Sequence, residues 1–448
     1  MPPLRRSVPS AFLDPDFGAA GEVHLHSLLG VEGVEVRAVN SLLVLKDNSI
    51  LVAVEIRENG RLGPGLMKLD AAGGLDRTFN DNTGYLNERY ASDGYLSAYP
   101  SQLVMFDEGR FLSFVRYVNP KTNDYNLGCT RYYLNGERDG SFNNDGRVLM
   151  GHFPPLRDVV DSLEQPQRRS TLKAHPYVDV DGKITVDFTH QHWAIQQPRS
   201  YIVQLNSNGS IDYTFHEDGY LQLQYQDTAM EIRAMIPSPT AGWIVAGKAG
   251  RTGLVARLDA KGRLDNSFGT EGFYATAPTG ANDLRFETDE NPVSGYAISL
   301  ENVWVTASNT LIVIGSNQPT DNPDRVGGLL FRLDQSGHPD PSFTPSYWMI
   351  ANQKTSLQGI DATLTGGQYW VAGQQQPIDS ALPPQGLLLR VTEHGAPDKS
   401  FGCDGFLSMP GVRRIADINV QHDGKCLVAT TEATEVQTDA AKVRRFKA

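Results

Sequence analysis

The chain has 448 residues and a formal net charge of −12 at pH 7. An acidic surface repels phosphate backbones and anionic lipid headgroups, so this charge argues against a nucleic-acid partner and against a membrane-surface protein. No stretch of the sequence approaches the roughly 18 consecutive apolar residues that a membrane-spanning helix needs. Length alone would suggest about three domains.

A short motif recurs seven times along the chain and changes that expectation. Six copies end on Asp, any residue, Ser or Thr, and Phe, and a variant copy is Asp14-Pro15-Asp16-Phe17. The motif phenylalanines lie 53 to 75 residues apart, and a period of this size indicates a solenoid, a propeller or an array. The motif positions are Asp14 and Phe17, Asp76 and Phe79, Asp139 and Phe142, Asp212 and Phe215, Asp265 and Phe268, Asp340 and Phe343, and Asp398 and Phe401.

Each repeat continues with the same parts in the same order. The motif is followed by a turn that closes on Gly in all copies but the sixth, and then by a short strand-like run such as residues 22–25. Two apolar runs then flank a hairpin signal such as Lys46-Asp47-Asn48-Ser49, and a further apolar run leads to the next motif. Four strand candidates per repeat, without helical periodicity, predict an all-β fold: a seven-bladed β-propeller of four-stranded antiparallel blades.

The two ends of the sequence complement each other. The last repeat finishes with a strand-like run at 441–446 and has no motif after it, whereas the first begins with a motif and has no strand before it. We therefore expect Phe446 to lie against Phe12-Leu13-Asp14, and the strand near 22–25 to pair in the same sheet as the C-terminal strand, which closes the ring. We predict a single propeller domain over 1–448, with a closing segment at 10–21 and blades at about 22–70, 85–134, 147–205, 220–258, 273–333, 346–391 and 406–447.

The motif residues have the character of structural positions. Asp side chains accept hydrogen bonds from backbone N–H groups two or three residues further on, and Ser and Thr do so more weakly. A Phe ring can fill the gap between successive blades. A residue needed in all seven repeats suits a scaffold better than a catalytic site, which is needed once. The alternative is a ligand site repeated in every blade.

One repeat carries a specific resemblance. Residues 258–272, with the sequence LDAKGRLDNSFGTEG, closely resemble the bacterial delta-60 repeat, which occurs in families of unknown function that are assigned to β-propellers. The resemblance extends over nearly the whole chain and implies the propeller fold. It carries no known active site that could be transferred to this sequence.

Function in a repeat fold tends to lie where the repeat is broken, and two repeats are unusually long. The third has an irregular segment from about 151 to 176, and the fifth has one from about 275 to 292 that includes Asp283 and Arg285. Both segments are polar and contain Pro. They are predicted to be loops that project from one face of the scaffold, where binding sites are often found.

The third repeat also contains His190-Gln191-His192-Trp193, with Arg199 nearby. On a strand, positions i and i+2 face the same side, so the two histidines could share a metal. Without a third ligand, such a pair is more often an ordinary part of a strand, and we predict no metal site and no cofactor. The candidate binding residues are His190, His192, Trp193, Arg199, Asp283 and Arg285.

These observations predict a non-enzymatic binding scaffold for a protein or glycan partner, held on one propeller face or at the central channel. One alternative is a hydrolase or lyase with an axial site, for example at His190, His192 and Asp283. No phosphate-binding Gly-rich loop, no G-x-S-x-G and no H-E-x-x-H is present, so we assign no catalytic residue. Another alternative is a bacterial effector or toxin component, or its inhibitor, that acts by protein contact.

Cysteine usage and the N-terminus bear on the compartment. Three widely separated cysteines form neither a metal-ligand pattern nor an even disulfide framework, and no apolar signal region follows residues 1–6. We therefore expect a cytoplasmic monomer that binds neither nucleic acid nor membranes, with export by a signal-independent route as the alternative.

Overall fold

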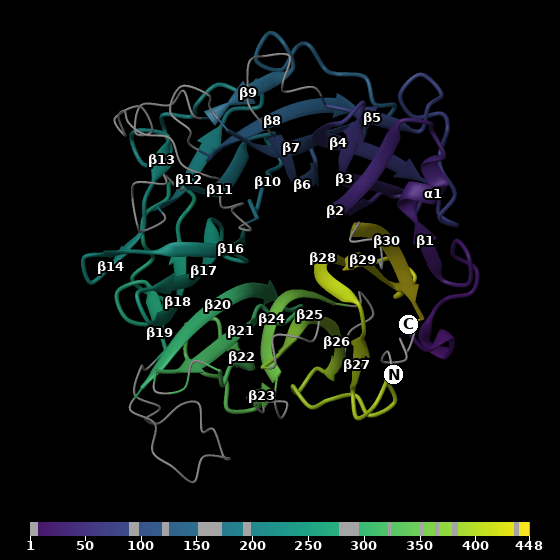
Figure 1. The fold of residues 1–448 in the computed structure, drawn as a ribbon. Coiled ribbons are helices and arrows are strands. Elements are labelled where there is room, and N and C mark those ends of the chain that lie inside the picture. The colour runs from purple at the N-terminus through teal and green to yellow at the C-terminus, as the bar shows by residue number, and fades with distance from the viewer. Residues whose placement is uncertain are drawn as a thin grey trace. The chain divides into compact units, whose positions relative to one another are not determined.

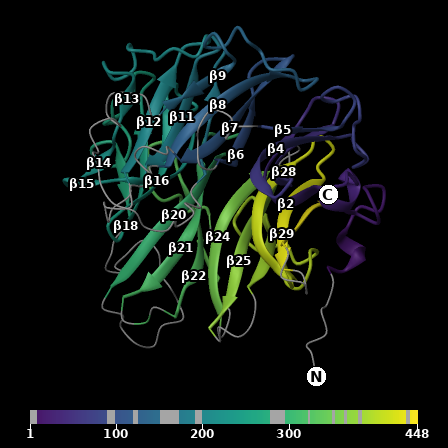
Figure 2. The ribbon, with the colours of Figure 1, turned by 45° about the horizontal axis from the view of Figure 1, so that its top comes forward.

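A computed structural model gives the structure of the chain. It describes residues 8–88, 98–118, 125–150, 173–190, 199–276, 295–320, 322, 324–343, 345–348, 353–362, 367–378, 384–433 and 439–447. The described residues form seven antiparallel sheets of four strands each, the blades of a propeller fold, and Figures 1 and 2 show these sheets in two views. By contacts the chain divides into two compact units, one of residues 16–223 with 438–443, and the other of residues 1–15, 224–437 and 444–448.

Three sheets lie within the unit that contains residues 16–223. The first consists of β2 (Val34–Val44), β3 (Ile50–Glu58), β4 (Arg61–Leu69) and β5 (Tyr85–Asn87). The second consists of β6 (Ala98–Met105), β7 (Arg110–Val118), β8 (Tyr125–Tyr133) and β9 (Arg147–Leu149). The third consists of β10 (Tyr177–Val178), β11 (Ile184–His190), β12 (Arg199–Leu205) and β13 (Tyr220–Leu221).

Three more sheets lie within the unit that contains residues 224–437, after a two-stranded ribbon of β14 (Gln224–Tyr225) and β15 (Thr228–Ala229). The fourth sheet consists of β16 (Glu231–Pro237), β17 (Trp243–Ala249), β18 (Thr252–Leu258) and β19 (Phe273–Ala275). The fifth consists of β20 (Tyr296–Val305), β21 (Leu311–Pro319), β22 (Gly327–Leu333) and β23 (Ser346–Trp348). The sixth consists of β24 (Gln353–Ala362), β25 (Gln368–Pro377), β26 (Gln385–Thr392) and β27 (Phe406–Met409).

The seventh sheet joins strands from the two ends of the chain. Its order is β1 (Glu22–His24), β30 (Asp439–Phe446), β29 (Cys426–Ala433) and β28 (Val412–Val420). A 3-10 helix, η1 (Ser10–Phe12), and an α-helix, α1 (Leu25–Leu29), are the helical elements of the described residues. Within this part of the chain, no helix has the length and apolar character needed to span a bilayer.

The closure expected from the chain ends is confirmed. The strand β1 lies beside β30 in the seventh sheet. Leu13 forms an antiparallel bridge with Phe446, and the backbone N–H of Asp14 donates to the carbonyl oxygen of Arg445 over 2.8 Å. The first motif therefore completes the last repeat, as the complementary ends of the sequence predict.

The grouping of strands differs from the predicted blade ranges in one respect. Those ranges placed the short strand after each motif first in the following blade, as at 85–134, but this strand pairs with the strand that precedes the motif. For example, Tyr85 of β5 lies opposite Met67 of β4. The cause is the tight motif turn, in which Gly84 takes a φ of 80° and accepts a hydrogen bond from the backbone N–H of Lys68. This turn folds the chain back onto the strand it has just left.

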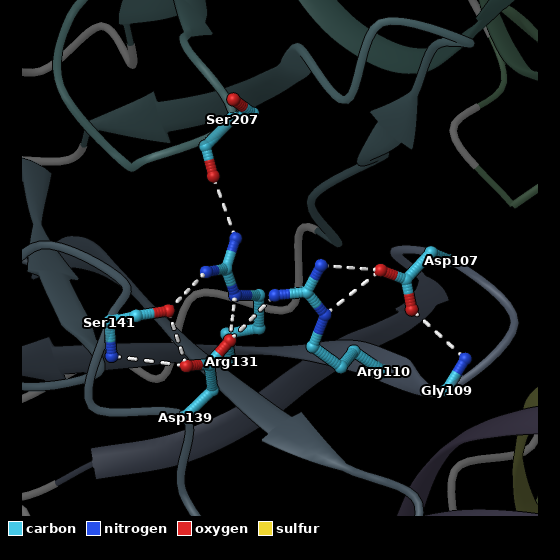
Figure 3. A network of polar contacts seen from close by, with 7 residues as sticks. All are labelled: Asp107, Gly109, Arg110, Arg131, Asp139, Ser141 and Ser207. Carbon is cyan, nitrogen blue, oxygen red and sulfur yellow. Dashed lines mark hydrogen bonds and ion pairs between the residues drawn. The ribbon is translucent and has the colours of Figure 1, made fainter.

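Figure 3 shows the motif contacts of the second repeat. One carboxylate oxygen of Asp139, Oδ1, accepts from the backbone N–H of Ser141 at 3.0 Å and from its hydroxyl at 2.6 Å. The other, Oδ2, accepts from Nε of Arg131 at 2.8 Å and from Nη1 of Arg110 at 2.9 Å. Burial opposes ionisation, but the hydrogen bonds from Ser141 and Arg110 and the charge of Arg131 hold the pKa of Asp139 well below its usual range.

The same pair recurs along the chain. In each case the motif carboxylate binds a cationic side chain of its own repeat, so its oxygens have intramolecular partners. The pairs, with their N–O distances, are Lys68–Asp76 (3.0 Å), Lys183–Asp212 (2.5 Å), Arg257–Asp265 (2.8 Å), Arg332–Asp340 (2.8 Å), Arg390–Asp398 (2.7 Å) and Arg445–Asp14 (2.8 Å).

Five motif phenylalanines lie in apolar cores that combine residues of two successive sheets: Phe79, Phe142, Phe268, Phe343 and Phe401. All seven rings are buried. Phe79, for example, packs with Leu51 and Leu66 of the first sheet and with Leu103 and Phe111 of the second. The guanidinium groups of Arg131, Arg257, Arg332 and Arg390 also lie over the rings of their own motifs, at 4.6 to 5.2 Å from the ring centroids. In these four motifs, the arginine that pairs with the Asp therefore also contacts the Phe ring that packs between two sheets.

We expect removal of the motif carboxylate to cost most where the pair is most buried. The side chain of Asp139 is 1% exposed and that of Asp265 is 31% exposed. Asp139→Ala leaves the buried guanidinium of Arg131 without its counter-ion and should lower the free energy of unfolding by about 3–5 kcal/mol. Asp265→Ala, the matched control, should cost about 1 kcal/mol. Urea unfolding measures both, and equal losses would contradict the dependence on burial.

Candidate functional site

The ends of each sheet differ in character. In an antiparallel four-stranded sheet, the turn between the first two strands and the motif turn lie at one end, which we call the motif end. The hairpin between the second and third strands, and the segment that enters the first strand, lie at the other end, the loop end. In the third sheet, the pairing of Tyr177 with Thr185 and of His190 with Arg199 assigns residues 173–176, the end of β11 and the start of β12 to the loop end.

The sequence-predicted binding residues fall mostly beyond the described chain. The backbone of His190 ends β11 and that of Arg199 begins β12, and the two residues are directly opposite in register. Their side chains lie outside the described residues, as do His192, Trp193, Asp283 and Arg285. The shared-metal hypothesis for the two histidines therefore stays a prediction. Among the residues that are described, no cluster of three or more His, Cys, Asp or Glu side chains could hold a metal ion.

A histidine–aspartate pair lies at the loop end of the third sheet. Oδ1 of Asp187 is 2.8 Å from the backbone nitrogen of His175 and 3.0 Å from its ring Nδ1. The Asp187 side chain is buried, whereas 19% of the His175 side chain is exposed. A carboxylate beside Nδ1 favours the tautomer that is protonated there, so Nε2 of the neutral ring keeps its lone pair. The imidazole is thus oriented as a base, a hydrogen-bond acceptor or a metal ligand.

Asp187 belongs to a row of buried polar side chains on one face of β11. Thr185, Asp187 and Thr189 alternate along the strand and so point to the same side. The hydroxyl of Thr185 accepts from Nε2 of Gln204 at 2.8 Å, and the hydroxyls of Thr189 and Ser200 are 2.8 Å apart. On the opposite face, Ile184, Val186 and Phe188 join the apolar core shared with the second sheet.

This polar row departs from the repeat. In five sheets, the third-strand cation that binds the motif carboxylate lies opposite an apolar residue of the second strand. In the third sheet, Gln204 has the position of that cation and lies opposite Thr185. The apolar residues in the other five sheets are Leu51, Leu112, Ile244, Ile312 and Trp370. Two positions further on, the other sheets have apolar residues and the third sheet has Asp187. Those apolar residues are Ala53, Phe114, Ala246, Ile314 and Ala372.

Two side chains of the second sheet form hydrogen bonds with the segment before His175 and with β11. The hydroxyl of Ser101 on β6 accepts from the backbone N–H of Ala174 at 3.2 Å, next to His175. Nη2 of Arg116 on β7 donates to the carbonyl oxygen of Thr189 at 3.3 Å. The segment that carries His175 is therefore bound both to its own sheet and to its neighbour, which limits the freedom of the imidazole.

Sequence patterns alone did not single out His175 or Asp187. A usable signal was present, because Thr185, Asp187 and Thr189 break the apolar character that the second strand has in other repeats. Recognising it requires the register of each hairpin, since the repeats differ in turn length. His175 lies twelve residues before its partner, in a segment without regular structure.

A second departure is the buried carboxylate of Glu88, directly after β5. The hydroxyls of Ser113 and Tyr132 donate to it at 3.0 and 2.7 Å. Burial raises the pKa of Glu88, although those hydrogen bonds and the charges of Arg147 and Arg138 act in the opposite direction. By strand register, the equivalent positions in other described repeats are Met150, Leu223, Thr276 and Met409.

Glu88 should make stability fall as the pH rises. Its pKa in the folded protein lies above the ordinary value of 4.5, so the folded state retains a proton that the unfolded state has lost. Its destabilising effect is absent below pH 4.5 and grows as the pH rises through the folded pKa. Glu88→Gln cannot ionise, so its stability relative to the wild type should increase over this window.

Urea unfolding of the wild type and Glu88→Gln at several pH values measures this difference. The control is Glu108→Gln, which changes an exposed carboxylate paired with Lys46 and should show no such gain. Parallel pH profiles for the wild type and Glu88→Gln would contradict the raised pKa.

Comparison with known proteins gives a family match over part of the chain. A model of the domain of unknown function DUF5122, described as a beta-propeller, matches residues 181–215, which include β11, β12 and the motif from Asp212 to Phe215. No curated protein matches the chain in sequence. The similarity to DUF5122 thus falls on the repeat that carries Asp187, while the delta-60 designation stays a prediction.

Several solved structures are similar to the chain at low sequence identity. A protein from Lactobacillus plantarum is 12% identical with a TM-score of 0.41, over 84% of this chain and 86% of that one. An ulvan lyase of polysaccharide lyase family PL25 is 9% identical with a TM-score of 0.43, over 91% and 93% of the two chains. Prolyl oligopeptidase B from Galerina marginata is 10% identical with a TM-score of 0.44, over 93% of this chain and 52% of that one.

Proposed function

We propose that this propeller is a binding protein whose contact surface includes the loop end of the third sheet, with His175 as a ligand-contacting side chain. The observation that carries the proposal is the His175–Asp187 pair. A buried carboxylate orients a partly exposed imidazole at the loop end of the third sheet. The partner would be a protein or a glycan, as the sequence also suggests.

The motif chemistry supports a scaffold. The motif carboxylates are engaged by cations of the same chain, from Lys68–Asp76 to Arg445–Asp14, so they are not available to a ligand without breaking those pairs. The departures from the repeat introduce polar side chains where other sheets have apolar ones. An imidazole acceptor that is held in place loses little conformational freedom on binding a hydroxyl or amide donor, which glycans and peptides both present.

We expect His175→Ala to weaken binding about tenfold, the effect of losing one oriented hydrogen bond to a partly buried group. A glycan array and affinity capture with the full chain identify a partner, and titration calorimetry then compares the variants. Asp187→Asn, which keeps the size of the side chain but removes its charge, should give a smaller loss.

His338→Ala is the matched control, because this histidine is 67% exposed and lies in a motif-end turn of the fifth repeat. It should bind the partner as the wild type does. Unchanged affinity in His175→Ala, with the variant folded, would contradict the proposed contact.

The same pair favours an alternative, a hydrolase or lyase in which His175 is the general base. An imidazole whose Nδ1 is held by a carboxylate is the usual arrangement for proton abstraction by Nε2. Turnover of a panel of hydrolase and lyase substrates, lost in His175→Ala, would support the enzyme and replace the binding proposal. An effector or inhibitor role, the remaining alternative from the sequence, stays a prediction.

A further inference from the structure

Two neighbouring turns of the third repeat expose apolar side chains at the motif end. Val180, in the turn between β10 and β11, is fully exposed, and Tyr213, in the motif turn, is 65% exposed. Both residues belong to the unit that contains residues 16–223. They lie at the opposite end of the third sheet from His175, so they form no part of the site proposed above.

Direct contacts hold the two turns together. Nζ of Lys183, three residues after Val180, lies 2.5 Å from Oδ2 of Asp212, which directly precedes Tyr213. Oδ1 of the same carboxylate accepts from the backbone N–H of Thr214 at 2.9 Å, which fixes the motif turn. Because the turns are bound to each other, the two apolar side chains belong to one surface.

The fold does not require apolar side chains at these two positions. In the other described repeats, the same positions have charged, polar or small residues or proline. They are Lys46, Asp107, Pro239, Ala307 and His422 in the turn between the first two strands, and Pro15, Arg77, Gly140, Asn266, Pro341 and Lys399 in the motif. Exposed Val and Tyr gain no burial within this chain, and apolar groups rimmed by polar ones are typical of interaction sites.

The same two turns carry exposed carboxylates. Asp181, Glu217 and Asp218 are exposed, and no cation of the described part of the chain forms an ion pair with them. The lysine of these turns, Lys183, is already bound to Asp212. The apolar pair therefore lies in a locally negative field.

Glu217 is not the residue that its backbone conformation favours. Its φ is 63°, in the left-handed region that Gly and Asn adopt most easily. The equivalent residue of the second repeat is Asn144, with a φ of 67°. The geometry of the turn therefore does not account for a negative charge at this position.

These features together define the partner. A neutral glycan gains no Coulomb attraction from unpaired carboxylates, and a nucleic acid or an anionic lipid is repelled by them. An arginine is attracted by the carboxylates, and its planar guanidinium also stacks on the face of a Tyr ring. We infer that the motif end of the third repeat binds a basic segment of a partner protein, in which an arginine stacks on Tyr213 and an apolar side chain contacts Val180.

Fluorescence anisotropy with the full chain tests the chemistry of this surface. The probes are two fluorescein-labelled peptides of equal charge, Arg-Leu-Arg-Ser-Arg amide and Lys-Leu-Lys-Ser-Lys amide. Stacking of a guanidinium on the ring predicts at least about threefold tighter binding of the arginine peptide. Equal affinity for the two peptides would overturn the stacking on Tyr213.

Variants that copy other repeats test the location. Tyr213→Asn reproduces Asn266 and Val180→Ala reproduces Ala307, and neither changes the net charge. The double variant should bind the arginine peptide about fivefold more weakly. Val31→Ala, which truncates an exposed valine elsewhere in the same unit, is the matched control and should bind normally. Unchanged affinity in the folded double variant would mean that only the overall negative charge attracts the peptide, and would overturn the assignment.

Further variants separate this surface from the site at the loop end. His175→Ala should bind the peptide as the wild type does, and a loss there would overturn the independence of the two surfaces. Glu217→Gln should weaken peptide binding at low ionic strength and have little effect in high salt. Binding of a neutral glycan that Tyr213→Asn abolishes, without binding of either peptide, would overturn the assignment to a basic segment.

Discussion

In six of the seven repeats, the motif aspartate forms an ion pair with a cation on the third strand, and this pair links the turn, the strand and the core. In the second repeat, Asp139 binds Arg131, and Arg131 in turn reaches the carbonyl oxygen of Ser207 in the next repeat. The same guanidinium covers the motif ring of Phe142, which packs between the sheets. One side chain therefore links the turn, the strand and the neighbouring blade. Because a buried guanidinium must keep its partners, this contact also holds the register between successive sheets.

Much of this architecture could be predicted from the sequence because it depends on local patterns. The spacing of the motif, the Gly and Asp turns and the short apolar runs are enough to predict four-stranded antiparallel blades and their closure through Leu13 and Phe446. The assignment of the short strand after each motif was harder. It depends on whether the chain folds back at a turn such as that of Gly84, which strand composition alone does not determine.

The candidate site was less accessible from the sequence, for a physical reason. His175 and Asp187 meet only because the segment before β10 runs alongside β11, and Glu88 meets Tyr132 only across two sheets. Such contacts depend on register and on packing between sheets, and neither leaves a short-range pattern. Once the register is known, the repeats serve as references for one another. Asp187 and Glu88 then stand out as two positions where the side chain differs in chemistry from most of its counterparts.

The seventh sheet has a consequence for how the chain reaches its native state. The hydrogen bond between Arg445 and Asp14 joins residues 431 apart in sequence, whereas the equivalent bond between Arg131 and Asp139 spans eight residues. Most motif pairs can therefore form as soon as their own repeat has been synthesised. The pair that completes the seventh sheet can form only after the far end of the chain has been synthesised. Its formation also costs more chain entropy, because it closes a much longer loop. During synthesis, Asp14 of the first motif consequently cannot bind Arg445 until the last strand has emerged.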